Sequence, residues 1–199
     1  MSAHVLYFGG YKSNLINIKD WTASACMQKP SVKFEGYEYP DILSSDGDDA
    51  VNAFKHHDEA IKKIQASTSD VIYIVGHSSG CAIANKIDAD LKDHEKIVLV
   101  ALDGYSPSNA QLARGNTQIW TAESGTGKSL HYADMLERGK DYNRKAKDPI
   151  KVNIYTATNS ASTKMALHFS LVNVSSSDAL VKHIPDGYKE CKANLCWLA

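Results

Sequence analysis

The chain has 199 residues and a formal net charge of −1, from 22 basic and 23 acidic residues, and 43% of it is hydrophobic. This near balance, without a long run of one sign, argues against a nucleic acid as partner. No apolar run approaches the roughly 20 residues needed to span a bilayer, so we expect no membrane contact. No signal-peptide pattern opens the sequence, which favours a cytoplasmic protein. The length predicts one globular domain, residues 1–199.

Short apolar runs alternate along the chain with longer segments of helical periodicity. The predicted strands are residues 5–8, 32–39, 71–75, 96–102, 117–122 and 150–158. The predicted helices are residues 13–28, 48–66 and 79–91. Strands that alternate with helices predict right-handed βαβ units. We therefore expect an α/β fold of three layers, with a mostly parallel sheet and helices on both faces.

The strongest functional pattern directly follows the apolar strand 71–75. Gly76-His77-Ser78-Ser79-Gly80 is a G-x-S-x-G sequence between a predicted strand and a predicted helix. Glycines on both sides permit the sharp turn that lifts the serine hydroxyl clear of the backbone. Ser78 is thus the candidate nucleophile. The amide of Ser79, at the start of the helix, is a candidate donor to an oxyanion.

Three segments resemble the α/β-hydrolase family, and within it the thioesterase-like branch. They are GHSSG at 76–80, ALDGYSP at 101–107 and ALHFSLV at 166–172. As an order of elements, the resemblance extends over nearly the whole chain. It implies a single-domain α/β-hydrolase fold and a serine hydrolase that cleaves an ester or thioester through an acyl-enzyme. Such chemistry needs no metal and no organic cofactor.

The base that activates the serine must be one of eight histidines. His168 follows the last predicted strand after a loop of small polar residues, and ALHFSLV surrounds it. The resemblance implies a base in the loop after the final strand, which favours His168. His183, nearer the end of the sequence, is the reserve candidate.

Three acidic residues could orient the histidine. Asp103 directly follows the strand 96–102, and the resemblance to the thioesterase-like branch favours it as the acid. Asp103-Gly104 is, however, also a common turn pair. Glu123 follows the next strand, at the position of the acid in most other α/β-hydrolases, and would suit a carboxylesterase. Asp141 is the third candidate.

A second oxyanion donor is expected in the loop after the first strand, because Gly9-Gly10 allows close approach to a substrate. The amide of Gly10 or Tyr11 is the candidate. The segment between Gly104 and the strand at 117–122 is short, which predicts a minimal lid and an open site. The expected substrate is an acyl group on a small molecule or on a larger carrier.

Two rival interpretations remain open. Residues 122–129, AESGTGKS, fit a relaxed P-loop in which Lys128 would contact phosphates and Ser129 would bind magnesium. A non-catalytic binding protein that retains the hydrolase fold is the other. The four cysteines, at 26, 81, 191 and 196, lack the spacing of a zinc site, and we expect them to be reduced.

Overall fold

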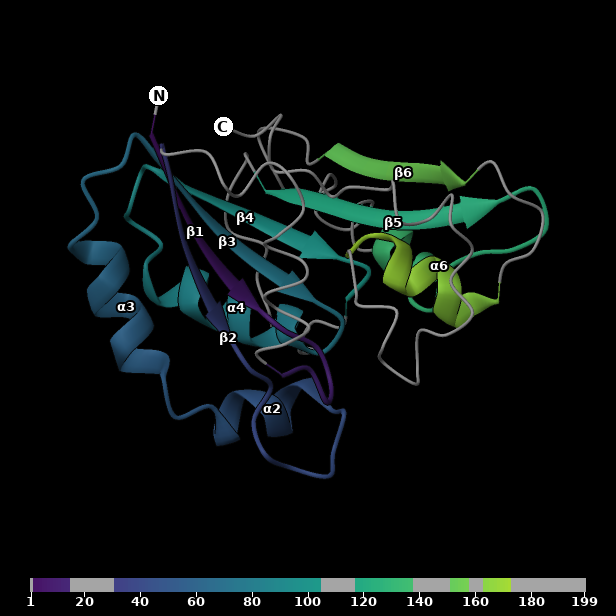
Figure 1. The fold of residues 1–199 in the computed structure, drawn as a ribbon, viewed down its shortest axis with the longest axis horizontal. Helices are drawn as coiled ribbons and strands as arrows, with labels where there is room; N and C mark the ends of the chain where they lie inside the picture. Colours follow the sequence, from purple (N-terminus) through teal and green to yellow (C-terminus); the bar gives the residue numbers. More distant parts are fainter. Residues whose placement is uncertain (1, 15–30, 105–116, 138–150, 158–162, 173–199) are drawn as a thin grey trace.

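The structure is a computed structural model, and it describes residues 2–14, 31–104, 117–137, 151–157 and 163–172. Within these ranges six strands form one sheet in the order β2-β1-β3-β4-β5-β6 (Figure 1). The strands are β1 Ala3–Phe8, β2 Val32–Tyr37, β3 Val71–His77, β4 Ile97–Leu102, β5 Gln118–Ser124 and β6 Lys151–Ala157. Every neighbouring pair is parallel. All six predicted strands and the parallel sheet are confirmed.

Four helices have described bounds: α2 Gly47–Ala53, α3 His57–Gln65, α4 Gly80–Asp90 and α6 Lys164–Ser170. The helix predicted at 79–91 is confirmed as α4. The helix predicted at 13–28 lies almost wholly outside the described residues. No helix in the described ranges has the length and apolar character needed to cross a membrane.

The prediction of one continuous helix over 48–66 was wrong, because the chain breaks between α2 and α3. Phe54 has extended backbone angles, φ −75° and ψ 105°. Its ring packs edge-on against Phe8 and Tyr37, with centroids 5.6 and 5.8 Å away. Phe54, Ala60 and Ile64 are all buried across the break, so tertiary packing overrides the helical pattern here.

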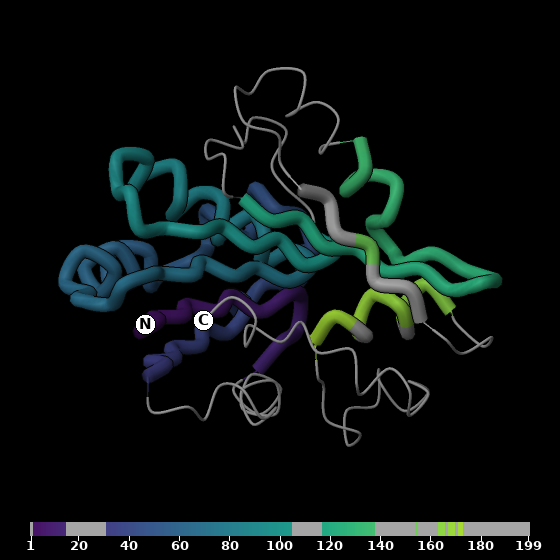
Figure 2. Tube along the Cα trace, turned by 90° about the horizontal axis from the view of Figure 1, so that it is seen from above, coloured from purple at the N-terminus to yellow at the C-terminus, as the bar shows by residue number. Residues whose placement is uncertain are grey.

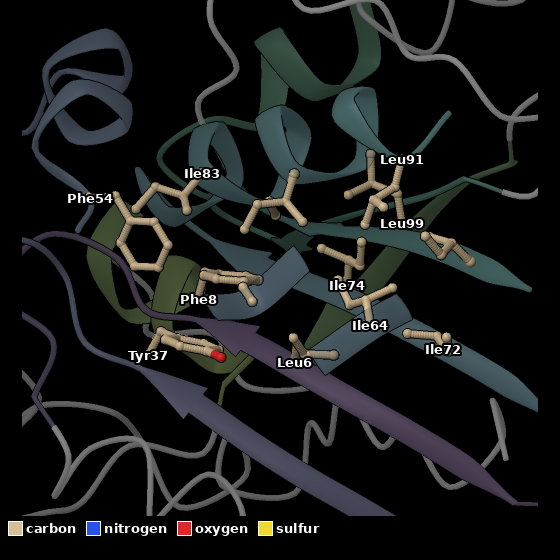
Figure 3. Close-up of a cluster of buried hydrophobic side chains, with 14 of the residues drawn as sticks. Leu6, Phe8, Tyr37, Phe54, Ile64, Ile72, Ile74, Ile83, Leu91 and Leu99 are labelled. Atoms are coloured by element: carbon tan, nitrogen blue, oxygen red, sulfur yellow. The ribbon is translucent and has the colours of Figure 1, made fainter. Parts of the chain in front are cut away.

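The two faces of the sheet carry separate apolar clusters because side chains alternate along each strand. On one face, strand side chains pack against α2, α3 and α4; this cluster includes Leu6, Phe8, Ile64, Ile72, Ile74, Ile83 and Leu99 (Figure 3). On the other face, β1, β3 and β4 side chains pack against Leu167 of α6 and Leu171, which directly follows this helix. Figure 2 shows α6 below the strands in that view. The described helices therefore cover both faces, as predicted.

The order in which the chain adds strands to the sheet reverses between β1 and β3. From β1 the chain continues to β2 on one side, whereas β3 is followed by β4, β5 and β6 on the other. The carboxyl ends of the two strands at such a switch point border a crevice in which ligands bind. The register pairs Phe8 with Gly76 and His77 with Leu102. The residues that follow β1, β3 and β4 therefore lie together at the carboxyl ends of the strands.

Gly80, the first residue of α4, lies directly against the end of β1. A Cβ atom at position 80 would be 2.3 Å from the carbonyl oxygen of Phe8 and 2.5 Å from that of Gly9. Backbone atoms cannot yield as a flexible side chain can. The glycine therefore lets α4 begin close enough to the sheet to place Ser78 at its edge.

We expect Gly80→Ala to destabilise the fold by about 1–3 kcal/mol, the usual cost of forcing an extra methyl into a packed site. The measurement is the urea unfolding free energy. Gly125→Ala is the matched control, because a Cβ atom at position 125 would meet nothing within 4 Å. Equal effects of the two substitutions would contradict the steric explanation.

Candidate active site

Ser78 occupies the junction between β3 and α4 in a conformation that few non-glycine residues adopt. Its φ is 53°, in the left-handed region. The Ser78 amide donates to the carbonyl of Leu102 at 3.1 Å, and its carbonyl accepts from the amide of Cys81 at 3.1 Å. Its hydroxyl makes no hydrogen bond to any described residue, and the side chain is half-buried. The backbone is fixed while the hydroxyl is left available.

The loop after β1 lies against this serine. A Cβ atom on Gly10 would be 2.6 Å from the Cβ of Ser78 and 2.9 Å from the carbonyl oxygen of His77. The amides of Gly10, Tyr11 and Ser79 donate to no partner among the described residues. The Tyr11 side chain points elsewhere, since its hydroxyl donates to the carbonyl of Leu43 at 3.0 Å. Gly10 therefore lies against Ser78 and Ser79 follows it in the chain, while the role of the three amides as oxyanion donors stays a prediction.

His168 and Asp103 are joined by a short hydrogen bond in the protein interior. The Nδ1 atom of His168 lies 2.6 Å from Oδ2 of Asp103, and both side chains are almost completely buried. The carboxylate fixes the tautomer in which Nδ1 carries a proton, which leaves Nε2 as the atom that can take one. The structure thus brings the predicted base and the favoured acid together.

The prediction that His168 lies in a loop was wrong, because the residue belongs to α6. Leu167 and Leu171 lie one helical turn apart, and both are fully buried against the sheet. That spacing matches the helical period and holds the segment as a helix on the sheet. The loop of small polar residues contributes part of the connection from β6, and its residues 158–162 lie outside the described ranges.

Asp103 is fully buried yet surrounded by donors. Its Oδ1 accepts from the hydroxyls of Ser129 at 2.6 Å and Thr121 at 2.8 Å. Its Oδ2 accepts from the amide of His131 at 3.3 Å, in addition to His168. Burial by itself acts to raise the pKa of Asp103, but the hydrogen bond and charge of His168 and the two hydroxyls lower it from 3.8 to about 2. The side chain is therefore a carboxylate at neutral pH.

His77 has a positioning contact that the sequence did not indicate. Its Nε2 donates to the backbone carbonyl of His168 at 3.2 Å, and the two rings are 4.5 Å apart. Burial lowers the pKa of His77 to about 3, so the ring is neutral. His77 therefore helps to hold His168, the candidate base, in place. The pattern G-x-S-x-G gives no signal for it, because its second position is open to many residues.

No hydrogen bond between Ser78 and His168 is present among the described residues, but the neighbours of Ser78 connect it to His168. His77, next to Ser78, contacts His168 directly. Leu102, which accepts from the Ser78 amide, is followed by Asp103, the partner of His168. Nucleophile–base hydrogen bonds are often long in free enzymes and shorten when substrate binds.

The other candidates lie away from this arrangement or outside the described residues. Glu123 accepts from the hydroxyl of Tyr132 at 2.7 Å and makes no described contact with His168. Asp141 and His183, like the cysteines at 26, 191 and 196, fall outside the described residues. Cys81 is buried, and its thiol donates to the carbonyl of Gly76 at 3.0 Å. Within the described ranges, no group of three or more His, Cys, Asp or Glu side chains could hold a metal ion.

The segment predicted as a possible P-loop does not form a phosphate cradle. The amide of Ser124 donates to the carbonyl of Gly127, the amide of Gly127 to the Ser124 hydroxyl, and the amide of Ser129 to the carbonyl of Ala122. A P-loop needs such amides free for phosphate oxygens and a helix that starts at the Lys-Ser pair. Here the helical residues begin only at 132. The segment is a closed turn that folds back on β5.

No family model and no curated protein sequence matches this chain. Similar solved structures share its fold. XC6422 from Xanthomonas campestris, described as an α/β serine hydrolase without a lid, has a TM-score of 0.53 and 11% identity, covering 78% of this chain and 72% of that one. ClbQ from the colibactin NRPS/PKS pathway has a TM-score of 0.50 and 11% identity, with coverages of 79% and 89%. The chain therefore has an α/β-hydrolase fold.

The neutral, buried His77 predicts a specific loss of stability in acid. The unfolded chain takes up a proton at position 77 below about pH 6.5, whereas the folded chain takes it up only near pH 3. Stability therefore falls as the pH drops through this window, by up to about 1.4 kcal/mol per pH unit from this group.

Urea unfolding of the parent and of His77→Gln, at several values between pH 7 and pH 4, measures the effect. We expect the variant to show the shallower dependence on pH. His56→Gln is the control, because the side chain of His56 is 60% exposed. Parent and His77→Gln slopes that coincide would show that His77 is not kept neutral by burial.

Proposed function

We propose that the protein is a serine hydrolase that cleaves an ester or thioester bond, with Ser78 as its nucleophile. The observation that carries the proposal is a serine with a left-handed backbone at the end of β3, next to His77, which contacts a carboxylate-bound histidine. A strained backbone that the surrounding contacts hold in place is typical of functional residues. A histidine bonded to a buried carboxylate is the usual means of activating a serine.

In the proposed reaction the Ser78 hydroxyl attacks the acyl carbonyl while Nε2 of His168 accepts its proton. Nδ1 of His168 remains bonded to Asp103, whose negative charge stabilises the imidazolium that forms. Asp103 stays ionised throughout, since its pKa is about 2. His168 then protonates the leaving group, which departs as an alcohol or a thiol and leaves an acyl-enzyme.

The charge that develops on the carbonyl oxygen requires fixed donors. The amide of Ser79, at the start of α4, and the amide of Gly10 or Tyr11 are proposed for this role. Their N–H groups have no described partner, and Gly10 lies against Ser78. Preorganised backbone donors of this kind commonly contribute a factor of about 10²–10³ to the rate. Water activated by His168 then releases the acid and restores Ser78.

The proposed substrate is an acyl group on a small molecule or on a larger carrier. The basis is the short connection between Gly104 and β5, which leaves little chain for a lid, although residues 105–116 lie outside the described ranges. XC6422, which has a similar fold, is described as lacking a lid. A screen of p-nitrophenyl esters and acyl thioesters, free and carrier-bound, identifies the preferred class.

Ser78→Ala should lower kcat on any accepted ester by several orders of magnitude, since it removes the hydroxyl that forms the acyl-enzyme. It should also abolish labelling by a fluorophosphonate probe. Ser45→Ala, which removes an exposed hydroxyl, is the control and should label like the parent. Persistent turnover or labelling in Ser78→Ala would refute the assignment of the nucleophile.

Asp103→Asn should lower kcat by about 10³–10⁴-fold, because the amide no longer fixes the productive tautomer of His168. Glu123→Gln is the matched comparison, since it makes the same change in a side chain that bonds Tyr132. We expect Glu123→Gln to keep kcat near the parent value. A larger loss in Glu123→Gln than in Asp103→Asn would transfer the role of the acid to Glu123.

A further inference from the structure

The Gly-Thr-Gly-Lys-Ser turn after β5 has no role in the reaction described above, yet its last residue, Ser129, bonds the carboxylate of Asp103. We propose that Ser129 and Thr121 are positioning residues that fix the Asp103 carboxylate in the orientation in which it holds His168. This inference rests on the proposed hydrolase function. It assigns a structural purpose to the sequence GTGKS that differs from phosphate binding.

The turn forms a clamp around both oxygens of the carboxylate. The Ser129 hydroxyl contacts Oδ1 of Asp103 at 2.6 Å, and two residues later the amide of His131 contacts Oδ2 at 3.3 Å. Beside Ser129, Thr121 of β5 contacts the same Oδ1 atom at 2.8 Å. Asp103 is thereby held against rotation about its terminal torsion, and Oδ2 is kept directed at His168.

The backbone of the turn fixes Ser129 itself. The amide of Ser129 donates to the carbonyl of Ala122 at 2.8 Å, and the amide of Ala122 approaches the Ser129 hydroxyl oxygen at 3.3 Å. Ser129 is buried, with 3% of its surface exposed. Residues 125–128 reverse the chain, so that Lys128 pairs antiparallel with Glu123. The turn therefore returns one hydroxyl to β5 at a defined position.

The two hydroxyls are not equivalent donors. The oxygens of Ser129, Thr121 and Asp103 form a triangle, with the Ser129 and Thr121 oxygens 2.8 Å apart. Two hydroxyl protons can satisfy only two of its three sides. Ser129 makes the shorter contact with the carboxylate, so Thr121 can donate either to Asp103 directly or to Ser129. Loss of Ser129 should consequently disturb Asp103 more than loss of Thr121.

The test uses Ser129→Ala together with two changes at Thr121: the isosteric Thr121→Val removes the hydroxyl, and Thr121→Ser keeps the hydroxyl but removes the methyl group. We expect Ser129→Ala to lower kcat roughly 10–100-fold, the effect of losing a hydrogen bond to a charged group, with little change in KM. Thr121→Val should lose less, and Thr121→Ser should stay near the parent. Thr126→Ala removes an exposed hydroxyl from the same turn and is the control.

A proton NMR measurement tests the clamp independently of turnover. The proton on Nδ1 of His168, in its short hydrogen bond to Asp103, should give a low-field resonance in the parent and in Ser78→Ala. We expect Ser129→Ala to weaken this resonance or speed its exchange, and Thr126→Ala to leave it unchanged. The resonance reports on Asp103 and His168 even when no substrate is turned over.

The outcomes separate the two proposals. A parent that hydrolyses no ester or thioester, but whose low-field resonance depends on Ser129, refutes the hydrolase and retains the clamp geometry. An active parent whose kcat and resonance are both unchanged in Ser129→Ala overturns the positioning role. If Ser129→Ala does not fold, equal kcat and equal resonances in Thr121→Val and Thr121→Ser overturn it instead.

Discussion

The structure around the site depends on one constraint, which is that the buried carboxylate of Asp103 must keep its negative charge without water. An ionised carboxyl group in a protein interior is stable only when donors compensate for the lost hydration. Four donors do so, and they come from β5, the turn after it and α6. Each of these segments must therefore be correctly docked before the histidine can be aligned. The requirement links the local chemistry to the packing of the central part of the sheet.

The parallel sheet supplies the other half of the arrangement. Adjacent strands of equal direction end at one edge, so residues separated by dozens of positions meet there without long excursions of the chain. The Ser78 amide bonds the carbonyl of Leu102, and the Asp103 amide bonds that of Trp120 at 2.7 Å. Successive strand ends are in this way tied to one another. Both Ser78 and Asp103 have positive φ values, 53° and 39°. The backbone hydrogen bonds between the strand ends help to hold these two residues in that conformation.

The strands and the Ser78 turn could be predicted because their signals are local: apolar runs of strand length, and glycines around a serine at a strand end. The break at Phe54 could not, since it depends on where Phe8 and Tyr37 place an aromatic pocket. The contact of His77 with the backbone of His168 spans 91 positions, and the bond of Ser129 to Asp103 spans 26. Such contacts follow from tertiary packing. In the case of GTGKS, the local pattern favoured a different chemistry, because glycine turns before a serine are shared by unrelated structures.

Because His168 lies on the short helix α6, the Asp103–His168 pair can be less stable than the fold as a whole. A helix of seven residues does not persist alone in water. Its geometry is imposed by the docking of Leu167 and Leu171 on the sheet. Partial, reversible detachment of such a peripheral segment costs less free energy than global denaturation. Heat or a solvent that weakens apolar contacts will therefore move His168 away from Asp103 while the central strands remain intact, so the Asp103–His168 pair separates before the protein unfolds.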